Sequence, residues 1–181
     1  TIQGAIVNNS GANITSVTKD GAGTWVLGGT NTYTGATTIN SGKLLINNSS
    51  NSGTGTGNVS VRGGTLAGSG RISGTVTADT ISLLPTATVA PGNSPGILST
   101  GSLSLSNDAA FIVELNGPTA GNGSNNYDQA NVTGTVALNG GSVGAGATLN
   151  VSVGYNAIIG QTFTIINNDG SDAVTGLFRD P

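Results

Sequence analysis

The chain has 181 residues, of which 35% are hydrophobic and 7% are charged, with a formal net charge of −3 and no His, Cys or Met. This composition lacks most of the side chains used as general acids, general bases or activated nucleophiles, and it excludes disulfides and thiolate metal sites. The few scattered basic residues and the lack of long apolar runs argue against nucleic-acid binding and against a membrane-spanning helix. We therefore expect a structural protein, not an enzyme, with no cofactor.

Apolar and polar residues alternate with a period of two along nearly the whole chain, which is the period of β-strands. No segment combines helical periodicity with capping residues, so an all-β fold is predicted. In chain order, the alternation predicts short strands at residues 24–27, 37–39, 43–46, 58–62, 71–73, 75–77, 102–106, 110–115, 131–133, 135–138, 148–153 and 161–166.

Loosely repeated strand–turn units favour a β-solenoid, in which each unit buries its face against the next. One such repeat is Gly28-Gly29-Thr30, which returns as Gly63-Gly64-Thr65. Stacking also explains the scarcity of charge, because like charges about 4.8 Å apart repel one another. With roughly 20–25 residues per coil, the chain would form about seven or eight coils and a rod of about 35 Å. A β-sandwich is the alternative.

Two stretches interrupt the repeats. Three prolines predict a loop or kink over residues 85–96, and a Gly- and Asn-rich composition predicts a second loop over residues 116–127. The first loop separates a repeat region at residues 1–84 from a C-terminal region at residues 97–181 with longer strands. The N-terminus has neither Met nor a signal-like segment, so we expect a processed or excised piece of a longer protein.

A specific motif lies within residues 15–46, where Lys19-Asp20-Gly21-Ala22-Gly23-Thr24-Trp25-Val26-Leu27 precedes a run ending in Gly42-Lys43-Leu44. It resembles the passenger-associated transport repeat of bacterial autotransporters, with Trp25 at a core position where Leu is usual. A looser resemblance extends over residues 15–178. The positions of this sequence that carry the resemblance are Gly21, Gly23, Trp25, Asn31, Tyr33, Gly35, Gly42, Tyr127 and Asp128.

The resemblance implies a right-handed parallel β-helix in the C-terminal part of an autotransporter passenger, either on the cell surface and anchored in the outer membrane or secreted. It implies a stalk of an adhesin that also assists folding and translocation, with adjoining passenger repeats and a C-terminal membrane β-barrel as neighbours. One alternative is a module that binds carbohydrate or a host protein through the 85–96 and 116–127 loops. Open strand edges and coil ends also predict self-association.

A polysaccharide-degrading enzyme is the least favoured alternative. Asp108 and Glu114 are the nearest approach to a catalytic carboxylate pair, but Arg71 and Arg179 lie far from them along the chain. Ser94 has the Gly-x-Ser-x-Gly spacing of a nucleophile elbow, yet the chain has no His to activate it. We therefore interpret both patterns as structural.

The remaining candidates also have structural interpretations. Trp25 and Tyr33 are able to stack on sugars, but their place in the repeat favours core or coil-cap positions. Tyr127 and Asp128 are expected to anchor the end of the 116–127 loop by hydrogen bonds.

The best candidate for Ca²⁺ binding is the Asn- and Asp-rich turn at residues 167–172, with Asp169 and Asp172 as ligands. The turn matches neither the EF-hand spacing nor the Gly-Gly-x-Gly-x-Asp nonapeptide of calcium-binding β-rolls. A solvated turn rich in Asn and Asp is therefore favoured over a metal site.

Overall fold

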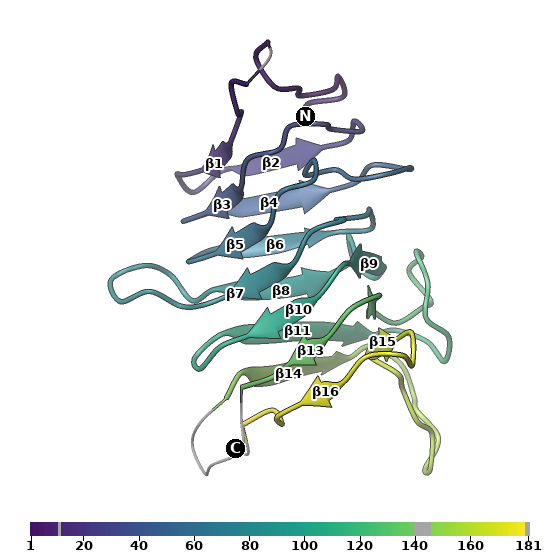
Figure 1. Ribbon diagram of the computed structural model, residues 1–181. Coiled ribbons are helices and arrows are strands. Elements are labelled where there is room, and N and C mark those ends of the chain that lie inside the picture. Colours follow the sequence, from purple (N-terminus) through teal and green to yellow (C-terminus); the bar gives the residue numbers. More distant parts are fainter. Residues whose placement is uncertain (11, 140–145, 180–181) are drawn as a thin grey trace.

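The computed structural model describes residues 1–10, 12–139 and 146–179. Its regular structure consists of short β-strands that stack into three sheets (Figure 1). All pairings between the named strands are parallel. No helix among the described residues is long and apolar enough to cross a membrane. The predicted all-β parallel solenoid is confirmed, and the β-sandwich alternative, which needs antiparallel sheets packed face to face, is wrong.

Each sheet collects one strand from successive coils. The first sheet has seven strands: β1 (Val17–Lys19), β3 (Thr37–Ile39), β5 (Val59–Val61), β7 (Val76–Ala78), β10 (Leu103–Leu105), β13 (Val136–Ala137) and β16 (Val174–Thr175). The second sheet has six strands: β2 (Thr24–Leu27), β4 (Lys43–Ile46), β6 (Thr65–Gly68), β8 (Thr88–Pro91), β11 (Ala110–Leu115) and β14 (Thr148–Val153). The third sheet has three strands: β9 (Ile97–Thr100), β12 (Gln129–Val132) and β15 (Ile166–Asn168).

The coils lengthen toward the C-terminus. In the first sheet Val17 pairs with Thr37, Thr37 with Val59 and Val59 with Val76, so the early coils take 17–22 residues. The next three coils take 27, 33 and 38 residues, as the pairs that link Val76, Leu103, Val136 and Val174 show. The extra residues form connections that project from the stack beside β7, β11 and β14 (Figure 1). The longer coils therefore still contribute strands to the sheets, and their additional residues lie in the connecting loops.

The core consists of rows of apolar side chains that run along the stack. In the second sheet one row contains Leu44, Leu66, Val89 and Phe111, all fully buried, with each residue paired to its neighbour on the next strand. Because every second residue of a strand points inward, the short three-residue strands of the first sheet contribute two core residues each. The outward-facing residues of this sheet form a row of mostly hydroxyl side chains: Thr18, Thr38, Ser60, Thr77, Ser104, Ala137 and Thr175.

The predicted strands agree with the structure where an adjacent coil supplies a partner strand. The predicted segments 24–27, 43–46, 110–115 and 148–153 coincide with observed strands. The predicted strand at 161–166 is wrong except for its last residue, because the pairing of Ile166 with Ala130 places residues 161–163 beside the irregular residues 125–127 that precede β12. The predicted strand at 71–73 is reduced to a single bridge from Arg71 to Ser99.

The predicted loop at residues 85–96 is wrong in its middle part, where β8 runs from Thr88 to Pro91. Proline is tolerated there because the nitrogen of Pro91 faces β11, whose pairing with β8 ends at Val89, so no ladder hydrogen bond is lost. The turn of the loop is therefore confined to residues 92–96, between β8 and β9. The second predicted loop matches the irregular connection between β11 and β12.

The C-terminal end of the stack is covered by the last described residues. Phe178 stacks on the buried Phe111 with ring centroids 5.9 Å apart. The backbone N–H of Arg179 donates to the carbonyl of Ala147 at 2.8 Å. In contrast, Val151 and Val153 of β14 are 47% and 58% exposed. The cover therefore protects one part of the final coil and leaves another part of its apolar face open.

Candidate functional site

The transport-repeat motif occupies the first two coils. Each coil contributes a strand, a tight turn and a second strand: β1 leads to β2 through residues 20–23, and β3 leads to β4 through residues 40–42. Gly21 and Gly42 have φ angles of +75° and +70°, a region that favours glycine. A Cβ atom on Gly42 would collide with the carbonyl oxygens of Gly21 and Gly23, because the two turns lie directly against each other.

The other motif residues fix the far side of these coils. Asn31 is buried, accepts the N–H of Ile6 at 2.6 Å and donates to the carbonyl of Gly53, so it links three successive layers. Tyr33 is fully buried, and its hydroxyl lies 2.6 Å from that of Thr37. Burial raises the pKa of Tyr33 above its usual value. Gly35 lies where a Cβ would collide with the backbone of the preceding layer.

The resemblance places Trp25 at a core position where Leu is usual, but in the structure Trp25 does not lie in a closed core. Its side chain occupies the same row as Leu44 of β4, yet it is 41% exposed because β2 is the last strand of its sheet. With Thr1, Ile2 and Val26 it lines an open cavity of about 220 Å³ at the N-terminal end of the stack. The coil-cap interpretation of Trp25 therefore describes its position better than the core interpretation.

The motif also contains a buried cation, Lys19, to which the sequence pattern assigned no role. Lys19 is fully buried, and its Nζ atom lies 5.6 Å from the centroid of the Trp25 ring. The signal was present in the sequence, because alternation along Val17-Thr18-Lys19 places Lys19 on the same inward face as Val17. A charged residue at an inward position is rare unless it is paired, and it therefore marks a special site.

A second polar site joins the two loops that the sequence singled out. The carboxylate of Asp128 accepts the N–H of Gly96 at 2.7 Å and the N–H of Glu114 at 2.8 Å. The side chain of Asn122 accepts the N–H of Ile97 at 2.7 Å. The 116–127 loop thus folds back on the 92–96 turn, and Asp128 anchors its end as expected.

Tyr127 contributes by packing: it is 7% exposed, and its ring meets that of Phe163 edge to face at 5.3 Å. Its backbone N–H donates to the carbonyl of Thr119 at 2.9 Å, which closes the loop on itself.

The electrostatics of this site centre on Asp128, which is 3% exposed. Burial is the largest effect and raises its pKa to about 6, since removal from water disfavours the charged carboxylate. The two backbone N–H donors oppose this shift, and the negative charge of Glu114 adds to it. Asp128 is therefore a buried carboxylate held between the 92–96 turn of one coil and β11 of the next.

A small pocket lies beside Asp128 on the outer face of the second sheet. It has a volume of about 100 Å³, and its polar lining includes Lys43, Asn93, Ser94 and Glu114. The hydroxyl of Ser94 donates to the Glu114 carboxylate at 2.8 Å. Ser94 thus acts as a hydrogen-bond partner at the pocket rim, and its φ angle of +87° belongs to the tight turn.

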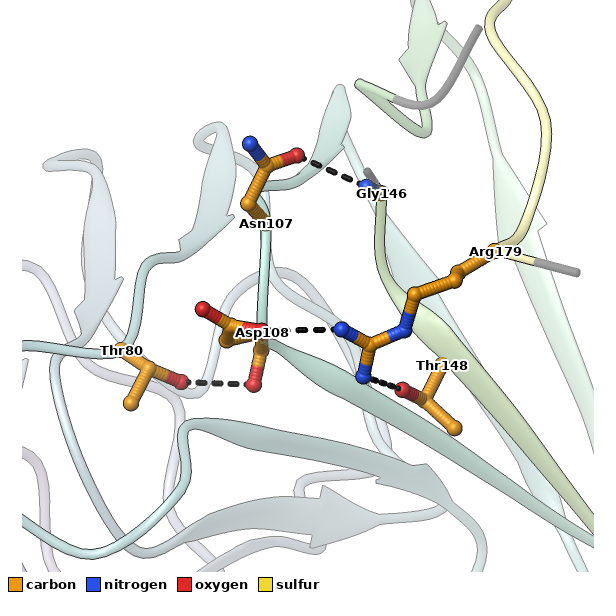
Figure 2. Close-up of polar contacts among 6 residues, drawn as sticks. All are labelled: Thr80, Asn107, Asp108, Gly146, Thr148 and Arg179. Carbon is orange, nitrogen blue, oxygen red and sulfur yellow. Dashed lines mark hydrogen bonds and ion pairs between the residues drawn. The ribbon is translucent and has the colours of Figure 1, made fainter. Parts of the chain in front are cut away.

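The structure does not bring Asp108 and Glu114 together. Asp108 lies in the turn before β11, whereas Glu114 is the penultimate residue of that strand, so about 13 Å of extended chain from Ala110 to Glu114 lies between them. Asp108 instead forms an ion pair with Arg179 at 3.0 Å, and the same guanidinium donates to Thr148 at 2.8 Å (Figure 2). Arg179 is far from Asp108 along the chain, as the sequence shows, but the structure brings the two side chains together because the chain end folds back over the last coil.

The turn at residues 167–172 organises its own side chains. The Ser171 hydroxyl donates to the carboxylate of Asp169 at 2.7 Å, and the side chain of Asn168 donates to the carbonyl of Asp172 at 2.9 Å. The hydrogen bonds from Ser171 lower the pKa of Asp169. Among the described residues, no three His, Cys, Asp or Glu side chains gather in a way that would hold a metal ion.

These features define a parallel β-solenoid whose first two coils carry a specialised pair of stacked turns. Residues 17–46 match the family model described as Passenger-associated-transport-repeat. The match begins at the first residue of β1 and ends at the last residue of β4, so one repeat corresponds to two stacked coils. The chain therefore carries the passenger repeat of autotransporters over these residues. No curated protein and no solved structure shows a significant match to the chain.

Proposed function

We propose that this chain is a structural, non-enzymatic segment of an autotransporter-like adhesin passenger at the bacterial surface, where it serves as a stalk and as a folding module during export. The observation that carries this proposal is the continuity of the stack. The two coils of the passenger repeat at residues 17–46 continue in register through the first sheet to β16. A rod of this kind supports reach and rigidity without any need for catalytic side chains.

The proposed folding role follows from the way coils stack. Each coil offers a row of apolar side chains and open backbone groups on which the next coil forms, so folding propagates between neighbours. The pairing of β11 with β14 covers six residue pairs, whereas every other strand pairing covers two to four. We therefore assign the folding nucleus to the C-terminal coils.

Two matched substitutions test this order of events. Val113 of β11 and Val59 of β5 are both buried in the core, and replacing either by Ala should lower the free energy of unfolding by about 2 kcal/mol. If the C-terminal coils form first, Val113→Ala slows refolding, while Val59→Ala mainly speeds unfolding. Stopped-flow fluorescence of Trp25 follows the arrival of the N-terminal coil. The reverse pattern, or unchanged refolding after deletion of residues 131–178, would contradict the proposed nucleus.

A second candidate function is binding of a carbohydrate or host protein at the joined loops. The observation in its favour is the pocket of about 100 Å³ beside the 92–96 turn, where the hydroxyl of Ser94 donates to Glu114 and where Asn122 of the 116–127 loop holds the start of β9. Glycan-array binding should then fall on replacing Glu114 by Gln and remain unchanged on replacing the exposed Asp79 by Asn. An array without signal for the unmodified chain would count against this candidate and leave the stalk proposal intact.

A further inference from the structure

The ammonium group of Lys19 is held by an unusual set of partners. It donates to the backbone carbonyls of Asp20 at 3.0 Å, Gly21 at 2.6 Å and Ser41 at 3.0 Å. We call these three oxygens the carbonyl cage. An ammonium group has three N–H donors and no acceptor, so the cage satisfies every donor. The charge is therefore buried without an unmade hydrogen bond.

The cage contains no carboxylate. The nearest acidic residue in sequence, Asp20, directs its side chain elsewhere and accepts a hydrogen bond from Asn40 at 2.8 Å. Within the described ranges, the one ion pair is that between Arg179 and Asp108, far along the chain. Burying an unpaired charge is costly in general, so the carbonyl dipoles must take over the role of a counter-charge.

The cage is shared between two coils. Asp20 and Gly21 belong to the turn from β1 to β2, whereas Ser41 belongs to the turn from β3 to β4. Three carbonyl oxygens that converge on one point repel one another unless a cation lies between them. Lys19 thus removes a repulsion that would otherwise oppose the stacking of the two coils of the repeat.

Two neighbours shape the cavity around the cation. Gly42 leaves room for the ammonium group, since a Cβ there would collide with Gly21 O and with Lys19 Nζ. The Trp25 ring covers another side at 5.6 Å, a distance at which an aromatic face attracts a cation. The surroundings therefore match those of a site for a small monovalent cation, in which backbone carbonyls replace the hydration shell.

We propose that Lys19 acts as a tethered cation in a monovalent-cation site built by the passenger repeat, and that its charge, not its apolar stem, holds the two turns together. When the ammonium group is removed by mutation, the same cage would bind a free ammonium or potassium ion. This inference concerns the chemistry of the repeat itself and does not depend on the proposed stalk or folding role.

The first test separates charge from packing. Lys19→Met keeps most of the stem but removes the cation, and it should raise the equilibrium constant for unfolding at least about a hundredfold, because three carbonyls lose their donor. Lys43→Met is the matched control at the other lysine, which is exposed, and it should change that constant by less than about threefold. Equal stability of Lys19→Met and the unmodified chain would overturn the proposal.

The second test supplies the missing ion. Lys19→Ala is unfolded in urea at equal ionic strength in ammonium, potassium and choline chloride, with Trp25 fluorescence as a local probe. Ammonium or potassium should lower the unfolding constant about tenfold relative to choline, which is too large for the cage. Lys19→Met, whose thioether fills the cavity, should show no such difference. A folded Lys19→Ala variant that responds equally to all three salts would contradict the inference.

If Lys19→Ala does not fold in any of these salts, the proposal is tested by measurements on the unmodified chain. Nitrogen-15 NMR of the lysine side chains should show a slowly exchanging NH₃⁺ signal for Lys19 at neutral pH and none for Lys43. Acylation of Lys19 by a water-soluble amine reagent should be at least about a hundredfold slower than that of Lys43, since it requires local opening. Similar acylation rates, or the absence of a protected ammonium signal, would overturn the proposal.

Discussion

Asp128 makes the stability of this solenoid dependent on pH in an uncommon direction. The residue is buried between the 92–96 turn and β11, and its pKa is raised to about 6 from an ordinary value of 3.8. Between pH 4 and pH 6 the folded chain therefore keeps a proton at Asp128 that the unfolded chain has released. Because stability falls with rising pH wherever the folded state binds more protons, this group destabilises the fold as the pH rises through that window.

The size of the effect follows from the shift. A difference of about two pKa units corresponds to about 3 kcal/mol, present in full below pH 4 and lost by about pH 7. Asp169 acts in the opposite direction: its pKa is lowered by Ser171, so it favours the folded state above the unfolded pKa and loses that contribution as the pH falls. The contribution of Asp128 must therefore be isolated by substitution.

Asp128→Asn removes the titration and keeps one acceptor for the N–H of Gly96, while its amide nitrogen faces the N–H of Glu114. We expect the free energy of unfolding of this variant to lack the decline of about 3 kcal/mol that Asp128 contributes between pH 4 and pH 7. Urea unfolding followed by circular dichroism provides the measurement, and amide exchange at Gly96 and Glu114 reports the local effect. Asp79→Asn, at an exposed position, is the control. Parallel pH profiles for Asp128→Asn and the unmodified chain would refute the reasoning.

Two further predictions concern the ends of the stack. Gly42→Ala should lower the free energy of unfolding by at least about 2 kcal/mol, because a Cβ meets backbone oxygens at a positive φ angle, whereas Gly23→Ala, with no neighbour near the added atom, should stay within about 1 kcal/mol. Phe178→Ala should lower it by about 2 kcal/mol through the loss of stacking on Phe111, while Arg179→Met should lower it by less than about 1 kcal/mol, since Asp108 is largely exposed. Thermal and urea unfolding of the four variants check both contrasts, and equal effects within either pair would contradict them.

Alternation of residue types predicts strands β2 to β5, β7 and β10 to β14 of this chain, and it gives no prediction at β1, β6, β9 and β16. It fails at residues 161–166, because a strand in a solenoid exists only where the adjacent coil also presents a strand, and the end of the 116–127 loop lies beside the start of this segment, with Tyr127 against Phe163. It also misses β8, since prolines outweigh the apolar pair Val89-Ala90 when the chain is read locally. The failure at residues 161–166 therefore reflects the register between coils, which no local pattern contains, whereas the failure at β8 reflects the local weight given to proline.

The candidate sites likewise divide into contacts within one repeat, which the sequence pattern indicates, and contacts between distant segments, which it does not. Gly21, Gly35, Gly42 and Asn31 lie at turns and close contacts within the matched repeat, where a known spacing relates them to one another. The ion pair between Arg179 and Asp108 joins residues 71 positions apart and depends on the chain end folding back. Likewise, the contact of Asp128 with Gly96 crosses 32 positions. Such pairings follow from which coil lies beside which, and the sequence alone does not state the coil lengths.

The two buried ionic groups explain how a chain with 7% charged residues still uses electrostatics to join its coils. Lys19 is satisfied by carbonyl oxygens of two turns, and Asp128 by backbone N–H groups of two strand ends. Each charge is thus matched to backbone dipoles that a solenoid supplies at every coil boundary. An opposite side-chain charge is not needed, and it would itself have to be buried. A few charges are therefore enough to join adjacent coils. Each must lie where the turns or strand ends of those coils expose either carbonyl oxygens, as around Lys19, or N–H groups, as around Asp128.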